Sequence, residues 1–268
     1  MSTTRRSSSR LRSSTYRLGP PIVVFLVVLG VWYAISLSLD PDRQFLLPTP
    51  NEVIDVGFVN QDNLFQVLEG LLWTLAVSMS GLVIAIVLGM TSAIMMSLAK
   101  WIETSFYPYA VIIQTVPILA IVPLVGLWLG FGFTSRVVVC VIISIFPIIT
   151  NTLFGLQSVP ASFHDLFTLH RANRLTRLFK LQFPNALPAI FAGFRISAGL
   201  SVIGAIVGEF FFRKGIPGLG RLLDLYRARL LTEQLFTALL FSSLLGILVF
   251  WGFGVLGKMA VGKWHETT

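Results

Sequence analysis

Charged residues are scarce in this sequence. Asp, Glu, Lys and Arg together make up 12% of the 268 residues, while 55% are hydrophobic. A soluble domain usually carries about 25% charged residues, so this chain has too few to cover a surface that faces water. A water-soluble enzyme, a disordered chain and a coiled coil are therefore poor interpretations. We expect most of the surface to lie in lipid or against other chains.

Residues for metal binding and catalysis are also few. The one cysteine, Cys140, lies in an apolar run and excludes an internal disulfide or a cysteine cluster. His164 and His170 do not have the i, i+4 spacing that places two ligands on one helical face. The G-x4-G-K sequences at 252–259 and 257–264 lack the Ser or Thr that would hold magnesium, and neither follows a predicted strand. We expect no metal, no bound cofactor and no catalytic site.

Long apolar runs dominate the chain instead. A helix needs about 20 apolar residues to cross the roughly 30 Å hydrocarbon layer. The run at 106–129 contains Pro117 and Pro123, so we expect that span to be kinked and packed inside the bundle. Six runs qualify as spans: 20–39, 70–99, 106–129, 137–156, 189–212 and 234–257.

The net charge of +8 suits membrane orientation better than nucleic-acid binding, because the bases lie mainly between apolar runs. Residues 1–19 hold five arginines and no acid, so we expect a disordered cytoplasmic tail there. We also expect a cytoplasmic tail at 259–268. With both termini inside, the loop 157–188 is also inside. The loop 213–233 is then outside although it is rich in bases. A seventh span or a re-entrant segment could explain this loop, but leucines alternating with arginines favour an interfacial helix.

Residues 157–188 form the most informative polar segment. Apolar residues within 163–169 precede the polar sequence Arg171-Ala172-Asn173, and apolar residues then resume at helical spacing. This pattern predicts two short amphipathic helices joined by a turn. One interpretation is a loop that lies on anionic headgroups. The other is an element that docks into a groove of a cytoplasmic partner.

The same segment resembles the EAA loop of binding-protein-dependent ABC transporter permeases, whose pattern is EAA-x3-G followed by a proline-marked entry into the next span. Asp165 takes the acidic position, Leu166 and Phe167 take the alanines, and Arg171 takes the glycine. The match rests on Ala172, Pro184, Leu187, Pro188, Gly193 and Arg195.

The resemblance extends from residue 45 to the C-terminus. FLLPTPNEVI at 45–54 is similar to a segment that follows the first span in permeases of the nitrate/sulfonate/taurine group. The stretches 114–132 and 146–156 look like that group's third and fourth spans, and VIGAIVGEFF with the GLG at 218–220 completes the likeness.

The resemblance implies an all-α integral membrane protein with six transmembrane helices, the type I ABC importer (MetI-like) permease fold, over 20–258 in a bacterial inner membrane. It implies a second permease copy, an external binding protein and cytoplasmic ATP-binding subunits that hold ATP and magnesium. Residues 160–178 would form a coupling helix on those subunits. The contacts expected there come from His164, Asp165, Leu166, Phe167, His170, Arg171, Ala172, Asn173 and Arg174.

The group resembled handles nitrate, sulfonates, taurine and nitrogen heterocycles such as thiamine precursors or riboflavin. The VIGAIVGEF span and the RAN sequence of the inner loop favour the heterocycle branch. A stand-alone secondary transporter or channel is the alternative, and a membrane anchor for an enzyme is a third class.

Glu209 is the only acid deep in a predicted span, which makes it a functional candidate because a carboxylate is costly in hydrocarbon. It could line the translocation path, or it could pair with Arg213 or Lys214 near the outer interface. Further candidates for the path are Gln114, Pro117, Asn151 and Trp128.

Overall fold

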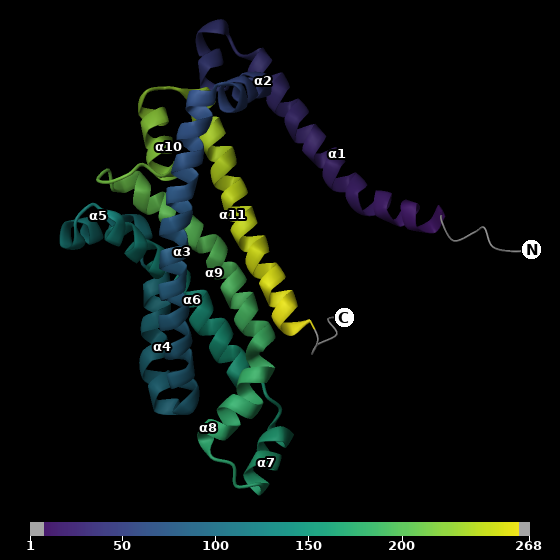
Figure 1. The fold of residues 1–268 in the computed structure, drawn as a ribbon, viewed down its shortest axis with the longest axis vertical. Coiled ribbons are helices and arrows are strands. Elements are labelled where there is room, and N and C mark those ends of the chain that lie inside the picture. Colours follow the sequence, from purple (N-terminus) through teal and green to yellow (C-terminus); the bar gives the residue numbers. More distant parts are fainter. Residues whose placement is uncertain (1–7, 263–268) are drawn as a thin grey trace, which may run out of the picture. The chain divides into compact units, whose positions relative to one another are not determined.

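The structure, a computed structural model, describes residues 8–262, and every regular element among them is a helix (Figure 1). This confirms the all-α membrane fold. Within residues 8–262, five helices are long and apolar enough to cross a membrane, and the bent pair α4 and α5 gives a sixth span if counted as one. The five are α1 (Ser8–Ser38), α3 (Gln61–Leu98), α6 (Phe133–Gln157), α9 (Phe183–Phe211) and α11 (Thr232–Val261), and the pair is α4 (Lys100–Thr115) with α5 (Ile118–Leu129).

The ends of the chain differ from the expected tails. Helix α1 already begins at Ser8, so residues 8–19 are helical and not disordered, whereas residues 1–7 lie outside the described residues. Extending a formed helix costs far less than nucleating one, which lets α1 continue beyond its apolar part. Helix α11 ends at Val261, and the expected tail from 263 onward lies outside the described residues.

The chain forms two compact units. The first holds the chain up to Leu64 together with Tyr226–Thr237, and the second holds Phe65–Leu225 together with the chain from Ala238. In the first unit, Trp32 of α1 stacks on Phe236 with ring centroids 5.3 Å apart. The short elements of this unit are η1 (Pro41–Leu46), α2 (Pro50–Ile54) and η2 (Asp55–Val59).

The sequence LPTPNE in the first unit is a helix start. Thr49 is the N-cap of α2, Pro50 follows at the first helical position, and the Glu52 carboxylate accepts a hydrogen bond from the Thr49 amide at 2.7 Å. The Glu52 amide donates back to the Thr49 hydroxyl at 3.4 Å. This reciprocal capping box satisfies two backbone amides that would otherwise lack partners. The capping box explains why Thr49, Pro50 and Glu52 occur together in the segment 45–54.

In the second unit, α6 and α9 form the most extensive helix pair. Small residues allow this close approach: a Cβ at Gly204 of α9 would lie 2.8 Å from the Cα of Cys140 in α6. Ser197 of α9 also donates a hydrogen bond to the carbonyl of Ser144 in α6 at 2.6 Å. Small residues and interhelical hydrogen bonds are the usual means of packing helices in lipid, where apolar side chains gain little by leaving the solvent.

The third predicted span is broken and not merely kinked. Helices α4 and α5 meet at 99°, with Val116 and Pro117 between them, because Pro117 lacks an amide and starts the new helix. In Figure 1, α5 runs across the direction of its neighbours. The expectation that this span packs inside the bundle is wrong for a single protomer, since Leu127 and Trp128 are 70% and 73% exposed.

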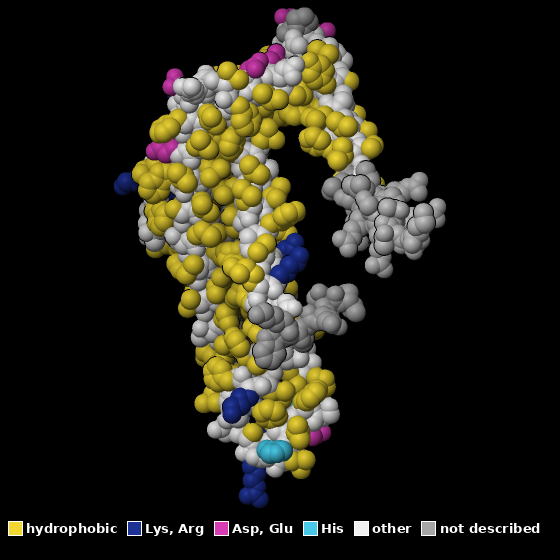
Figure 2. Space-filling model, turned by 45° about the vertical axis from the view of Figure 1, so that its right-hand side comes forward, with side chains coloured by type: hydrophobic (Ala, Val, Ile, Leu, Met, Phe, Trp, Pro, Cys, Tyr) yellow, Lys and Arg dark blue, Asp and Glu magenta, His cyan; other side chains and the backbone are white. Residues whose placement is uncertain are grey.

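The surface of the helices is apolar. Large hydrophobic side chains are exposed along every long helix, and in Figure 2 they cover most of the face in view, with basic side chains isolated among them. A water-soluble monomer rarely exposes so much contiguous apolar area. The composition therefore reflects a surface that lies in lipid or against other chains.

Candidate functional site

Helices α7 (Ala161–Leu169) and α8 (Arg174–Arg177) project from the end of the second unit where α6 ends and α9 begins (Figure 1). This confirms the two short helices joined by a turn. After α7 the Ala172 amide donates to the Phe167 carbonyl at 3.0 Å, and the Arg171 amide donates to that of Thr168 at 2.9 Å. These bonds form a Schellman motif, whose C′ residue adopts the left-handed conformation. Arg171 occupies that position with φ = +50°.

The turn continues into a capped α8. The side chain of Asn173 accepts a hydrogen bond from the Thr176 amide at 2.7 Å, so Asn173 is the N-cap. Arg177 donates to the Thr168 hydroxyl at 2.9 Å and so joins α8 to α7. We call α7, the turn and α8 the α7–α8 hairpin. All nine predicted docking residues, from His164 to Arg174, lie in this hairpin, which brings them together.

The hairpin presents apolar and basic side chains side by side. Phe163, Leu166 and Leu169 follow one another at helical spacing on α7 and are 51%, 49% and 81% exposed. Arg171 and Arg174 are also exposed. An apolar stripe beside basic residues, on helices too short to cross a membrane, is typical of a surface that another protein covers.

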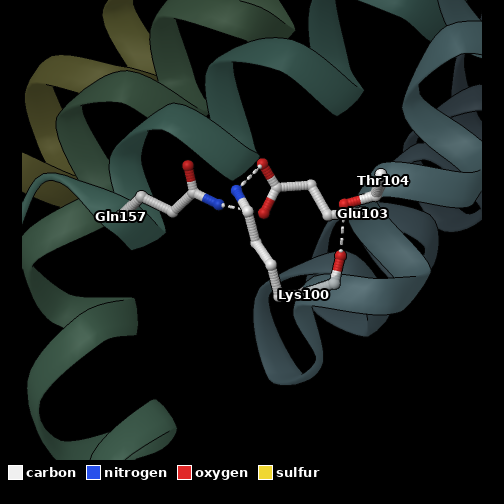
Figure 3. Close-up of polar contacts among 4 residues, drawn as sticks. All are labelled: Lys100, Glu103, Thr104 and Gln157. Carbon is white, nitrogen blue, oxygen red and sulfur yellow. Dashed lines mark hydrogen bonds and ion pairs between the residues drawn. The ribbon is translucent and has the colours of Figure 1, made fainter.

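A polar cluster ties the base of this hairpin to the start of α4 (Figure 3). Gln157, the last residue of α6, donates from Nε2 to Glu103 Oε2 at 2.8 Å. Lys100 Nζ donates to Glu103 Oε1 at 2.8 Å, and the Thr104 hydroxyl donates to the Lys100 carbonyl at 2.9 Å. Glu103 thus links the first turn of α4 to the residue at which α6 leads into the hairpin.

A cavity of about 290 Å³ lies beside the break between α4 and α5. Gln114, the last-turn residue of α4, lines it together with Pro147 of α6 and apolar residues of α9. Its lining does not include Pro117, Asn151 or Glu209. Pro117 lies at the break itself, and Asn151 donates to the Pro147 carbonyl at 2.8 Å within α6. Trp128 is absent from the lining as well, so the five predicted path residues do not share one cavity in this structure.

Glu209 lies near the end of α9 and is fully buried. Its Oε2 accepts hydrogen bonds from the Thr74 hydroxyl at 2.8 Å and from the Gly220 amide at 3.0 Å. The Leu219 amide donates to the same Thr74 hydroxyl at 2.8 Å. Leu219 and Gly220 begin α10 (Leu219–Ala228), so Glu209 and Thr74 together cap this helix, and a carboxylate at a helix N-terminus is also favoured by the helix dipole.

The glycines at 218 and 220 make this contact possible. A Cβ at Gly218 would overlap the Glu209 carboxylate, and one at Gly220 would lie 2.9 Å from the Glu209 Cβ. The alternative that Glu209 pairs with Arg213 or Lys214 is wrong, because the carboxylate bonds Thr74 and Gly220 and Arg213 instead pairs with Asp224 at 2.8 Å. Its assignment to the translocation path stays a prediction.

Arg136 is a buried base whose contacts the sequence did not indicate. It lies at the start of α6, is 3% exposed, and donates to the carbonyls of Phe212, Lys214 and Ile216, each at 2.9 Å. These carbonyls belong to the connection between α9 and α10, which we call the 212–218 loop. One buried guanidinium thus fixes three backbone groups that would otherwise lack partners.

Two bases of the segment 213–233 make contacts within this part of the structure. Arg213 pairs with Asp224, and Arg221 donates to the Gly215 carbonyl at 2.9 Å. Helix α10 is about 15 Å long at ~1.5 Å per residue, too short to cross a bilayer. This segment therefore does not supply a seventh span. A short helix is present where an interfacial helix is predicted, with Leu219, Leu222 and Leu223 buried. Its place at the membrane interface stays a prediction, and a re-entrant segment stays the alternative.

Comparison with known proteins agrees with this architecture. The model of the family described as "Binding-protein-dependent transport system inner membrane component" matches residues 81–261. The chain belongs to this family. The permease is 31% identical over 249 residues to the formylaminopyrimidine transport permease protein ThiX of Halalkalibacterium halodurans, covering 91% of this chain and 94% of ThiX. It is 30% identical over 256 residues to the riboflavin transport system permease protein RibX of Chloroflexus aurantiacus, covering 93% and 91%.

Among solved structures, the permease is similar to a chain of the MetNI methionine ABC transporter in an inward-facing conformation. The TM-score is 0.64 at 17% identity, over 74% of this chain and 98% of that chain. At this identity the likeness shows the fold alone. It confirms the MetI-like fold that the EAA-loop resemblance implied, and the family match confirms the membrane permease assignment.

Proposed function

We propose that this permease forms the translocation path of an ATP-driven importer for a small nitrogen heterocycle, with its α7–α8 hairpin seated on an ATP-binding subunit. The observation that carries the proposal is the hairpin itself: exposed Phe163, Leu166 and Leu169 beside exposed arginines. No nucleotide motif or metal cluster is found in the part of the chain that the structure describes. ATP and magnesium are therefore expected in the partner subunit.

The basic residues of the α7–α8 hairpin also indicate how the permease is oriented in the membrane. Arg171, Arg174 and Arg177 lie in the hairpin, and the positive-inside rule assigns such bases to the cytoplasm. The hairpin and both termini are then cytoplasmic, and α10 with the 212–218 loop is external. An external binding protein would deliver solute at the α10 end, and a second copy of the permease would complete the path.

A heterocyclic substrate is supported by the relatives. Formylaminopyrimidine is named for ThiX and riboflavin for RibX, and both align with more than nine tenths of this chain. Nitrate, a sulfonate or taurine is the second candidate, because the segment at 45–54 is similar to that of the nitrate/sulfonate/taurine group.

The docking role is tested by Leu169→Asp. Leu169 is 81% exposed, and a carboxylate there should prevent an apolar contact, so we expect loss of co-purification with the ATP-binding subunit. Thr104→Asp is the matched control, because it adds the same charge to an exposed residue at the same end of the second unit, outside the hairpin. Equal co-purification of both variants would contradict the docking role and favour a loop that lies on lipid headgroups.

The transport role is tested in proteoliposomes that contain the permease, its ATP-binding subunit and its binding protein. We expect ATP-dependent uptake of a labelled aminopyrimidine or flavin in preference to nitrate or taurine. Uptake that persists without the ATP-binding subunit would instead support a secondary transporter or channel. Uptake of nitrate or taurine alone would contradict a heterocyclic substrate and support the second candidate. The proposed role as an ATP-driven importer would still hold.

A further inference from the structure

Two basic residues of the membrane-spanning helices line one pocket and have no acidic partner within residues 8–262. Arg195 of α9 and Lys258 of α11 both contribute to a pocket of about 530 Å³. Neither takes part in the ion pairs found within residues 8–262, and their side-chain nitrogens donate none of the hydrogen bonds found there. The remaining lining is apolar or glycine, including Phe191, Phe253 and Gly254. The pocket thus carries positive charge that nothing in the described chain neutralises.

The depth of Arg195 makes this charge unusual. Arg195 lies about 24 Å along α9 from Phe211, at ~1.5 Å per residue, so a hydrocarbon layer of roughly 30 Å that begins at Phe211 extends past it. Lys258 lies in the last turn of α11. Both side chains line one pocket, so Lys258 lies at about the same depth as Arg195. This depth is inside the hydrocarbon layer, near its boundary on the side of the α7–α8 hairpin. A base at this depth is costly unless an anion or water reaches it.

The Arg195 guanidinium packs against an aromatic ring on one of its two faces. Its Cζ lies 4.2 Å from the ring centroid of Phe250, a cation–π contact that orients the plane of the group. Gly254 packs beside it, since a Cβ at that position would lie 3.2 Å from Arg195 Nε. Arg195 itself is exposed. Its planar set of donors makes no hydrogen bond to the described part of the chain, and a phosphate has the geometry that matches these donors.

The surroundings identify the source of the anion. The neighbouring residues of α11 on the surface are apolar and face outward: Val255, Leu256 and Met259 are 55%, 50% and 74% exposed. The pocket therefore opens onto the lipid-facing surface. We propose that Arg195 and Lys258 form a binding site for an anionic phospholipid, whose phosphate lies between the two bases while an acyl chain contacts Phe191 and Phe253. Basic pockets between membrane helices on the cytoplasmic side are suited to acidic headgroups.

Native mass spectrometry of the purified permease tests this site with phosphatidylglycerol and phosphatidylcholine as probes. We expect wild type to retain phosphatidylglycerol roughly 25-fold better than phosphatidylcholine, because each of the two bases near the surface contributes roughly a fivefold preference. Arg195→Gln combined with Lys258→Gln should abolish the preference, and Arg195→Lys combined with Lys258→Arg should keep it. Arg174→Gln combined with Lys180→Gln, which removes the same charge from the hairpin end, should also keep it.

The outcomes that overturn the proposal are distinct. An unchanged preference in the Arg195→Gln/Lys258→Gln variant, or an equal loss in the Arg174→Gln/Lys180→Gln control, would show that the site is not specific. Displacement of the lipid by millimolar inorganic phosphate would show an anion site that does not need a lipid. A change in subunit stoichiometry without a change in lipid would show that a second copy covers the pocket. If the Arg195→Gln/Lys258→Gln variant does not fold, Lys258→Gln alone tests the site, because Lys258 lies near the exposed end of α11. This single variant should show a smaller preference for phosphatidylglycerol than wild type.

Discussion

The Glu209 carboxylate and the Gly220 amide are joined by a 3.0 Å hydrogen bond that connects the end of α9 to the first turn of α10. Thr74 of α3 completes the contact by donating to the carboxylate and accepting from the Leu219 amide. Three helices therefore meet at one buried acid. The arrangement requires glycine at 218, because a side chain there would occupy the space of the carboxylate.

Gly218→Ala should destabilise the permease. The new Cβ overlaps the Glu209 carboxylate, so the cap of α10 has to move, and overpacking of this kind costs about 1–3 kcal/mol. The loss of stability is measured as a decrease in the thermal midpoint of unfolding of the purified protein. Gly252→Ala is the control: a Cβ there meets nothing within 4 Å on a helix, where alanine is favoured over glycine. If the two variants melt alike, the packing at Gly218 is not as described.

Glu209→Gln should preserve most of the transport activity. A glutamine oxygen can accept the same hydrogen bonds from Thr74 and Gly220, and Oε1 of Glu209 has no hydrogen-bond partner to lose within the described chain. Glu209→Leu should lower both stability and uptake, since it leaves the buried Gly220 amide unsatisfied at a cost of about 1–3 kcal/mol. Uptake and thermal midpoint are measured together. Loss of uptake in a stable Glu209→Gln variant would instead support a charged residue in the path.

Arg136→Lys should loosen the 212–218 loop. The guanidinium bonds three carbonyls at once, and a single ammonium on a flexible chain cannot reproduce that planar geometry. Hydrogen exchange of the loop amides should become faster. Arg213→Lys is the matched control, because the Arg213 side chain is largely exposed and a lysine there keeps the positive charge opposite Asp224. Equal hydrogen exchange in both variants would contradict the conclusion that the Arg136 guanidinium holds the 212–218 loop in place.

The sequence predicts the helical elements well because their signals are local. Runs of about 20 apolar residues and the break at Pro117 depend on neighbouring residues alone. The α7–α8 hairpin is predicted for the same reason, since its helical periodicity and its polar turn are both visible in the segment 157–188. Two of these local expectations differ from the structure: residues 8–19 are helical, and the third span is not packed inside the protomer. The second difference arises because an apolar residue such as Trp128 suits lipid and protein neighbours equally.

The partners of the buried charges could not be predicted in the same way. Thr74 and Glu209 are 135 residues apart, and no spacing relates them. Arg136 binds backbone carbonyls, which every residue has, so its acceptors leave no pattern in the sequence. A signal did exist at Gly218 and Gly220: two glycines shortly after an acid within a span indicate a backbone that approaches a side chain closely.

Gln157→Leu should reduce the coupling between ATP hydrolysis and transport more than it reduces stability. Gln157 joins the end of α6 to Glu103 at 2.8 Å, and an exposed polar link of this kind contributes at most about 1 kcal/mol. If the hairpin is moved by an ATP-binding subunit, this bond passes the movement to α4. The measurement is solute transported per ATP hydrolysed. Thr104→Val, which touches only its own helix, is the control, and an unchanged ratio for Gln157→Leu would exclude the link.

Arg171→Gly should stabilise the turn of the hairpin. Arg171 adopts φ = +50°, a conformation that costs a non-glycine residue about 1 kcal/mol and glycine almost nothing. The neighbouring residue supplies the control, because Ala172 has no positive φ and Ala172→Gly should give no such gain. Slower hydrogen exchange of the amides at 171 and 172, which bond the Thr168 and Phe167 carbonyls, would report the effect. Faster exchange in Arg171→Gly would mean that the arginine side chain, and not the backbone conformation, stabilises the turn.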